Sequence, residues 1–253
     1  MRRGLIAAAI ALVLGAVAVV ALAGTGGPPP APATPRASAA AFLDRYVTAD
    51  GRVVRRDQSG DTVSEGQSYA LLLAVATGDE RRFATVWRWT ASHLQRPDGL
   101  LAWHWVGGRL AGRDPATDAD LDAARALLVA GRRFGRPAFR AQGIRIGRAV
   151  LASETAHGVL VAGPWARGAG IVNPSYSAPR AFRSLGTATG DGRWGALAAA
   201  SRSATAALTA PAPHLPPDWA RMTASGPRAT GAPGTSDAPD YGYDAVRVPL
   251  RLA

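Results

Sequence analysis

Three short segments of the chain combine carboxylates with glycine and aromatic residues in patterns that a purely structural helix does not need. They are Val63–Tyr69 (VSEGQSY), Ala116–Asp122 (ATDADLD) and Tyr241–Pro249 (YGYDAVRVP). Two carboxyl groups in one site can act as a general acid and a general base, because one donates a proton while the other accepts one. These segments therefore hold the candidate catalytic groups.

Glu65 is predicted to lie in the first turn of a helix, because Ser64 and Gln67 have the spacing of a capping box. One interpretation is that a glutamate in that position has no role beyond complementing the helix dipole. Gly66 argues for more, since a glycine in a helix costs about 1 kcal/mol relative to alanine. Close approach of a ligand would explain this glycine.

The other two segments also admit a structural interpretation. Asp118, Asp120 and Asp122 open a predicted helix, where acids commonly cap the end and complement the dipole. Asp244 and Arg247 have the i, i+3 spacing of an ion pair on a helix surface. The four histidines have no metal-ligand spacing and the chain has no cysteine, so neither a metal site nor a cofactor is expected.

Together these segments resemble glycoside hydrolase family 8, whose members include bacterial endoglucanases, chitosanases and xylanases. Six motifs carry the resemblance, and they occur in the family's order over nearly all of residues 40–253. They are Ser64–Tyr69, Leu100–Trp103, Ala116–Ala124, Asn173–Tyr176, Pro217–Trp219 and Tyr243–Pro249. The resemblance implies an all-α fold, an (α/α)6 toroid-type barrel of αα-hairpins with a substrate cleft across one end.

The resemblance also implies roles for individual residues. Glu65 corresponds to the family's general acid, Asp244 to the general base of its endoglucanase branch, and Asp118 to the aspartate that holds the sugar at the cleavage point. The residues expected to bind substrate are Trp103 (a stacking platform), Tyr176, Arg247, Tyr69, Asp120 and Gln67.

The implied function is an inverting endo-β-1,4-glucanase that hydrolyses cellulose or a related β-glucan. An inverting enzyme needs its two carboxyl groups roughly 6.5–9.5 Å apart, with room for water. A helix N-terminus favours ionised Glu65, so burial and the charge of Asp118 are expected to raise its pKa. Two alternatives stay open: the same fold acting on chitosan or xylan, and an inactive carbohydrate-binding or cell-surface protein.

The elements that must position these groups are predicted to be helices. Apolar residues recur at helical spacing, and two similar junctions, Thr77–Arg81 and Thr189–Arg193, each join two helical segments through Gly-Asp. Trp87, Trp89 and Trp194 are expected in the core, whereas Trp103 and Trp105 are expected in a loop or helix end. The Gly- and Pro-rich stretch 223–239 is expected to be less ordered.

The N-terminal region has the composition of an export signal. Residues 1–23 combine two arginines with a long apolar run and form a signal peptide or a membrane anchor. Residues 24–38 are a Pro-rich linker, and residues 39–253 form the catalytic domain. We therefore expect a secreted or extracytoplasmic protein, with an N-terminal membrane anchor as one possibility.

The net charge of +11 comes from arginines that are scattered singly, so a nucleic-acid partner is not expected. The expected partner is a polysaccharide, and the expected oligomeric state is a monomer. About eight helices are predicted where the barrel needs twelve, and the chain stops nine residues after Asp244. The barrel is therefore expected to be incomplete at its C-terminus.

Overall fold

The computed structural model describes residues 34–210 and 215–252, and the expected leader (1–23) lies outside these ranges. The described residues form eight α-helices: α1 (Pro35–Tyr46), α2 (Ser64–Thr77), α3 (Glu80–His93), α4 (Thr117–Arg133), α5 (Pro137–Ser153), α6 (Pro179–Thr189), α7 (Arg193–Thr209) and α8 (Val248–Leu252). None of the helices described is long and apolar enough to cross a bilayer.

Two of the helical hairpins are joined as the repeated Gly-Asp junctions predict. Gly78 ends α2 in the left-handed conformation (φ 81°), and the Asp79 carboxylate accepts the Arg82 backbone N–H at the start of α3. At the second junction Gly190 ends α6 with φ 69°, and Asp191 accepts the backbone N–H of Arg193. The local sequence therefore sets both helix ends.

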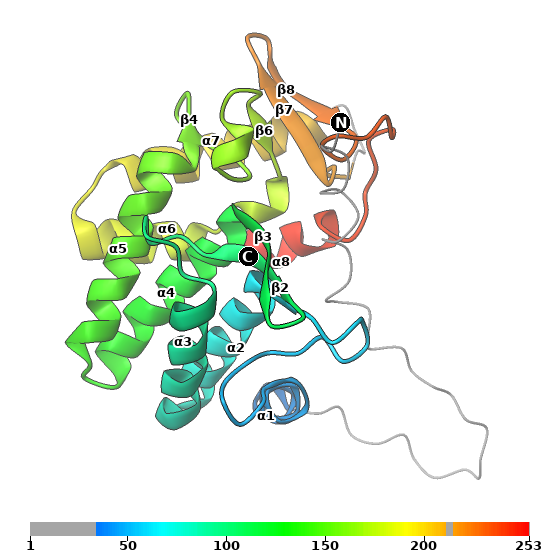
Figure 1. Cartoon of the computed structure of the whole chain (residues 1–253). Coiled ribbons are helices and arrows are strands. Elements are labelled where there is room, and N and C mark those ends of the chain that lie inside the picture. Colours follow the sequence, from blue (N-terminus) through cyan, green and yellow to red (C-terminus); the bar gives the residue numbers. More distant parts are fainter. Residues whose placement is uncertain (1–33, 211–214, 253) are drawn as a thin grey trace, which may run out of the picture.

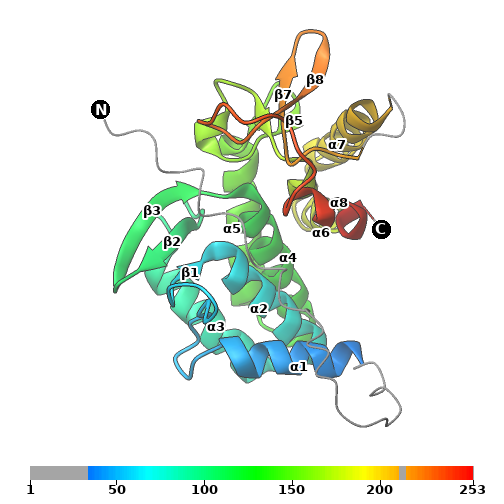
Figure 2. The same cartoon turned by 90° about the vertical axis from the view of Figure 1, so that its right-hand side faces the viewer.

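The helices form two layers. Helices α2, α4 and α6 pack against one another in succession, and each also packs against a flanking outer helix. The β7–β8 hairpin and α1 lie at opposite ends of the molecule, with α4 and α5 between them (Figures 1 and 2). Trp87, Trp89 and Trp194 are buried in the core, which confirms their expected position.

Short strands connect the helices, which is more β-structure than the sequence predicts. The strands are β1 (Thr62–Val63), β2 (Ala102–Val106), β3 (Arg109–Pro115), β4 (Thr155–Ala156), β5 (Val159–Leu160), β6 (Ile171–Val172), β7 (Trp219–Thr223) and β8 (Gly226–Thr230). They form three small antiparallel sheets, β1-β2-β3, β4-β5 and β6-β7-β8. Three 3₁₀ turns complete the described elements: η1 (Pro164–Ala166), η2 (Pro174–Tyr176) and η3 (Ala245–Arg247).

One sequence-based expectation is wrong and another is wrong in part, because strand pairing stabilises segments that look irregular in sequence. Trp103 and Trp105 lie in strand β2, not in a loop or helix end. The stretch 223–239 begins inside the β7–β8 hairpin, in which Trp219 pairs with Thr230 and Thr223 pairs with Gly226. Hydrogen bonds between paired strands, which the pattern of a single strand does not reveal, order Trp103, Trp105 and residues 223–230. Residues 231–239 contain no helix or strand.

Two helix starts also differ from the expectation. Helix α1 begins at Pro35, within the expected linker 24–38, because the Thr34 hydroxyl accepts the Ala37 N–H and proline suits the first helical position. Helix α2 has no capping box: Val63 is its N-cap and makes no side-chain cap bond. A Cβ on Gly66 would lie 3.4 Å from Val53 Cγ1, so this glycine faces internal packing and not a ligand.

Candidate active site

The guanidinium of Arg247 forms the centre of a buried polar cluster. Its Nη1 donates to Asp118 Oδ2 (2.8 Å) and to the Tyr69 hydroxyl (3.1 Å), while Nη2 donates to Ser175 Oγ (2.8 Å) and to Asp244 Oδ1 (2.5 Å). Arg247 and Asp118 keep only 9% and 1% of their surface exposed. A planar fork of donors suits this arrangement, because it can hold two carboxylates at fixed positions.

Four separate elements supply these partners. Tyr69 belongs to α2, Asp118 to the first turn of α4, Ser175 to η2, and Asp244 directly precedes η3. The i, i+3 ion pair between Asp244 and Arg247 predicted from sequence is present, although it is buried and not on a helix surface. The cluster therefore forms only when the helices pack.

A second contact fixes the Asp244 carboxylate. Its Oδ2 accepts a hydrogen bond from Asn173 Nδ2 (2.8 Å). The side-chain Oδ1 of Asn173 in turn accepts from the backbone N–H (3.0 Å) and hydroxyl (2.7 Å) of Ser175. Both oxygens of Asp244 are thus held, yet the residue keeps 7% of its surface exposed.

The environment of Asp244 shifts its protonation. Burial raises the pKa of Asp244 to about 6, and the negative charges of Asp118 and Asp218 act in the same direction. The Arg247 charge and the Asn173 hydrogen bond oppose this shift without cancelling it. Asp244 is therefore ionised above about pH 6.

Glu65 is perturbed more strongly. Burial raises the pKa of Glu65 to about 7, and the charge of Asp118 raises it further, while Arg247 and the Ser64 hydroxyl, 3.1 Å from Glu65 Oε2, lower it. Desolvation and like charge thus outweigh the helix N-terminus. Between about pH 6 and 7, Glu65 is protonated while Asp244 is ionised, so one group can donate a proton and the other can accept one.

Tyr176 lies within reach of all these charges. Its ring is 5.7 Å from the Arg247 guanidinium carbon. Burial raises the pKa of the Tyr176 phenol, and Asp118, Asp244 and Glu65 act in the same direction. The structure thus brings together six sequence-predicted site residues: Glu65, Tyr69, Asp118, Tyr176, Asp244 and Arg247. Within residues 34–210 and 215–252, no group of His, Asp or Glu side chains is arranged to hold a metal ion.

Trp103 lies on strand β2, which pairs with β1 directly before helix α2. Strand β1 pairs with β2 so that Thr62 faces Trp105 and Val63 faces His104. Strand β1 leads directly into α2, which carries Glu65 in its first turn.

The Trp103 ring is held in place on the sheet. It stacks on the His104 ring with centroids 4.5 Å apart, and His104 Nε2 lies 2.8 Å from Asp61 Oδ2. A Cβ on Gly112 would lie 2.0 Å from Trp103 Nε1, so glycine is needed there for the indole to lie over strand β3. His104 therefore has a structural contact that supports Trp103.

Gln67 and Asp120 are fully buried, and both are hydrogen-bonded within the protein. Gln67 accepts the Val53 backbone N–H (2.5 Å) and donates to Thr90 Oγ1 (2.6 Å). Asp120 Oδ1 accepts the backbone N–H of Leu101 (2.8 Å). Both side chains hold the segments around the cluster in place.

Glu154, which no sequence motif marked, faces Asp120. Both residues are fully buried, and neither Asp120 Oδ2 nor either carboxylate oxygen of Glu154 has a donor among the described residues. Burial raises the carboxyl pKa of each well above its ordinary value, and the two carboxyl groups are within hydrogen-bonding range of each other. A proton on this pair gives a donor to oxygens that otherwise have none, so we expect the two carboxyl groups to share one.

Trp165, in η1, also lies in none of the sequence motifs. It is 40% exposed, and its ring lies 6.5 Å from the ring of buried Trp219, which lies 6.1 Å from that of Tyr176. A continuous line of aromatic rings thus runs from an exposed indole to the buried cluster. An isolated tryptophan such as Trp165 forms no repeating pattern, so the sequence alone does not predict this line of rings.

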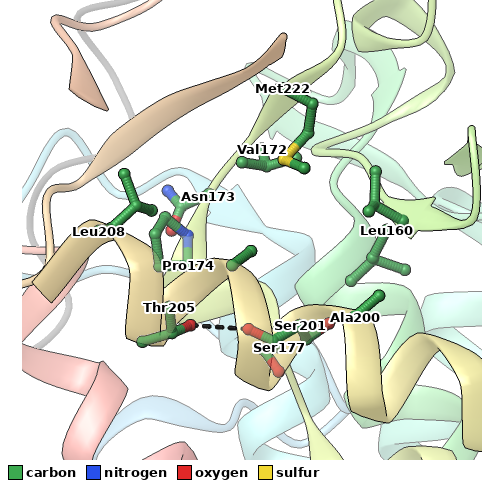
Figure 3. Close-up of a pocket in the computed structure, with 12 residues that line it drawn as sticks. Leu160, Val172, Asn173, Pro174, Ser177, Ala200, Ser201, Thr205, Leu208 and Met222 are labelled. Atoms are coloured by element: carbon green, nitrogen blue, oxygen red, sulfur yellow. Dashed lines mark hydrogen bonds between the residues drawn. The ribbon is translucent and has the colours of Figure 1, made fainter. Parts of the chain in front are cut away.

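Behind Asn173 lies a mostly apolar pocket of about 380 Å³, including its open mouth. Figure 3 shows Asn173 and Ser177 on its wall together with Leu160, Val172 and Met222. The hydroxyl of Ser177 is buried and has no hydrogen-bond partner among the described residues. The pocket therefore borders the residue that holds Asp244.

The comparison with known proteins fits this arrangement. Residues 31–253 match the sequence model of glycosyl hydrolases family 8, and the chain belongs to this family. It is 32% identical to a probable endoglucanase of Novacetimonas hansenii over 87% of this chain and 67% of that protein. It is also 32% identical to endoglucanase A of Acetivibrio thermocellus, over 84% of this chain and 46% of that protein.

The fold is likewise similar to that of solved family members. The endo-β-1,4-glucanase CMCax of Acetobacter xylinum superposes with a TM-score of 0.76 at 30% identity, over 86% of this chain and 71% of that structure. The expected α/α-barrel class is thereby confirmed. The chain spans about half to two thirds of the length of the sequence relatives described above.

Proposed function

We propose that this chain is the catalytic domain of an exported inverting endo-β-1,4-glucanase, with Glu65 as the general acid and Asp244 as the general base. The observation that carries the proposal is the order of the two pKa values, about 7 for Glu65 and about 6 for Asp244, on carboxyl groups that share one cluster. The similarity to endoglucanases supports a β-glucan substrate.

In the proposed reaction, Glu65 donates its proton to the glycosidic oxygen as the bond to the anomeric carbon breaks. Water attacks that carbon from the opposite face and gives a proton to Asp244. Asp118 keeps Glu65 protonated through its negative charge and is proposed to hold a hydroxyl of the sugar at the cleavage point. Each turnover ends with Glu65 ionised and Asp244 protonated, and exchange with solvent resets both.

Inversion is favoured because Glu65 and Asp244 are separated by an ion pair. Asp244 is bonded to Arg247, Arg247 is bonded to Asp118, and Asp118 is the carboxylate whose charge acts most strongly on Glu65. Asp244 is not among the main influences on the Glu65 pKa. Inversion requires these two carboxyl groups to lie roughly 6.5–9.5 Å apart, with a water molecule between Asp244 and the sugar.

The aromatic residues are proposed to bind the glucan. Trp103 and Trp165 present rings with exposed surface, and rings of this kind stack on the apolar faces of sugars. Tyr69 is hydrogen-bonded to Arg247, and the ring of Tyr176 lies against the same guanidinium. Both tyrosines are proposed to contact the sugar nearest the cleaved bond.

The test is Glu65→Gln, which keeps the shape of the side chain and removes the proton donor. Reducing-sugar release from carboxymethyl cellulose should fall at least ~1000-fold, with an unchanged circular dichroism spectrum. Glu80→Gln is the matched control, because Glu80 occupies the first turn of α3, and it should keep full activity. Near-normal activity of Glu65→Gln would exclude Glu65 as the acid.

The same assay separates the alternatives. Chitosan and xylan are tested beside carboxymethyl cellulose, and the anomer formed first is read by NMR. Faster release from chitosan or xylan would change the assigned polymer, and retention of the β-anomer would exclude inversion. Binding to glucan without any product would favour a carbohydrate-binding protein over an enzyme.

A further inference from the structure

Asp218, at the start of β7, is tied to the turn that carries Asp244. Its Oδ1 accepts two backbone N–H groups, from Gly242 (3.0 Å) and from Ala245 (2.6 Å). The N–H of Asp218 donates to the carbonyl oxygen of Asp240 (2.9 Å). Three hydrogen bonds thus connect one residue to backbone on both sides of Asp244.

The absence of a side chain at position 242 permits this contact. A Cβ on Gly242 would lie 2.5 Å from Asp218 Oδ2 and 3.2 Å from Asp240 Oδ2. The Asp218 carboxylate is already held by its two amide bonds and has little freedom to move away. Gly242, which lies between Tyr241 and Tyr243, is therefore required for the contact between Asp218 and this turn.

Strands β6 and β7 place two residues that hold Asp244, Asn173 and Asp218, close to each other. The strands pair antiparallel, with Val172 opposite Ala220, so Asn173 follows β6 close to where Asp218 precedes β7. Asn173 binds the Asp244 carboxylate directly, whereas Asp218 binds the backbone that positions it.

Asp218 also contributes charge. Burial is the main cause of the raised pKa of Asp244, and Asp118 and Asp218 both raise it through their negative charges. The groups of opposite effect are Arg247 and Asn173. Tyr176 faces the same carboxylate and stays neutral, because burial raises its own pKa.

We propose that Asp218 is a positioning residue for Asp244: its carboxylate clamps the 240–245 turn through two backbone amides and places a negative charge beside the base. The proposal rests on the proposed role of Asp244 in catalysis. Asp218 itself touches no reacting atom.

Two substitutions separate the clamp from the charge. Asp218→Asn keeps an oxygen that accepts both amides and removes the charge, so the acidic limb of kcat/KM should move to lower pH by about half a unit while the maximal rate is retained. Asp218→Ala removes the acceptor, so kcat should fall about tenfold or more with KM nearly unchanged. Asp237→Asn, an exposed aspartate of the same loop, is the matched control and should leave both unchanged.

An independent readout does not need turnover. The carboxyl carbon of Asp244, identified by its loss in Asp244→Asn, is titrated by NMR in the wild type, Asp218→Asn and Asp237→Asn. A lower midpoint in Asp218→Asn alone supports the proposal, even in a protein that hydrolyses no glucan, in which case only the catalytic assignment fails. An equal midpoint in all three proteins, or wild-type kcat in a folded Asp218→Ala, overturns it.

Discussion

Arg247 allows three buried carboxyl groups to coexist in one cluster. An unpaired buried charge is strongly destabilising, and breaking a buried pair typically costs about 3–5 kcal/mol. Arg247 satisfies Asp118 and Asp244 by direct hydrogen bonds, which leaves Glu65 as the carboxyl group without a bonded cation. The proton therefore stays on Glu65. The proposed acid and base roles follow from the two carboxylates, Asp118 and Asp244, that the guanidinium binds.

This arrangement predicts a narrow bell-shaped dependence of kcat/KM on pH. The rate should rise as Asp244 ionises, with a midpoint of about 6, and fall as Glu65 loses its proton, with a midpoint of about 7. Asp118→Asn removes the charge that raises the Glu65 pKa, so the alkaline limb should move to lower pH. Initial rates on a soluble β-glucan from pH 4 to 9 provide the measurement. An alkaline limb that stays in place in Asp118→Asn would contradict this account.

At the scale of elements, the first turn of α4 is where the site and the scaffold meet. Asp118 faces the cluster, while Asp120, two residues further on, points into the interior and binds Leu101 and faces Glu154 at the end of α5. The shared proton of this pair therefore stabilises the contact between α4, α5 and the segment before β2. Because the contact between Asp120 and Glu154 depends on a proton, the stability of the packing between α4 and α5 should depend on pH.

The sign of that dependence follows from the raised pKa values. A carboxyl group whose folded-state pKa is raised stabilises the fold fully at pH values below its unfolded pKa, and this stabilisation is lost as pH rises toward the folded pKa. Glu154→Gln supplies an amide donor to Asp120 and needs no proton. Relative to this variant, the wild type should lose up to about 1.4 kcal/mol of unfolding free energy per pH unit above about pH 4.

Urea unfolding of both proteins at pH 4.5 and pH 8 tests this prediction. Glu80→Gln, the same change at a half-exposed glutamate, is the control and should show no such difference between the two pH values. If Glu154→Gln is less stable than the wild type by the same amount at both pH values, Glu154 and Asp120 do not share a proton.

The sequence predicts the helix ends and the Asp244–Arg247 pair well because both depend on local signals, whereas the other residues of the cluster were expected from the family resemblance. Gly78 and Asp79 end one helix and start the next through neighbouring backbone groups, and Asp244 and Arg247 pair within one turn. Contacts between distant segments leave no such pattern. Asp218 and Gly242 are 24 residues apart, and the role of each is visible only when the turn folds back onto β7.

At the scale of the whole molecule, the chain carries a net charge of +11, with 29 basic against 18 acidic residues. A field of this size attracts anionic polymers, and salt screens it over a Debye length of about 10 Å at 0.1 M ionic strength. The active-site cluster itself is buried, so the field acts on the encounter with substrate and not on the chemical step.

This field should affect how tightly the protein binds charged glucans. Carboxymethyl cellulose is anionic, so its KM should rise about threefold or more between 20 and 300 mM NaCl, with kcat nearly unchanged. A neutral mixed-linkage β-glucan has no charge to be steered and should keep its KM over the same range. Chitosan, which is cationic, should show the reverse trend and bind better in high salt. The comparison of the three polymers separates steering from a general effect of salt on the enzyme, since equal changes in KM for charged and neutral glucans would show that the net charge plays no part in substrate capture.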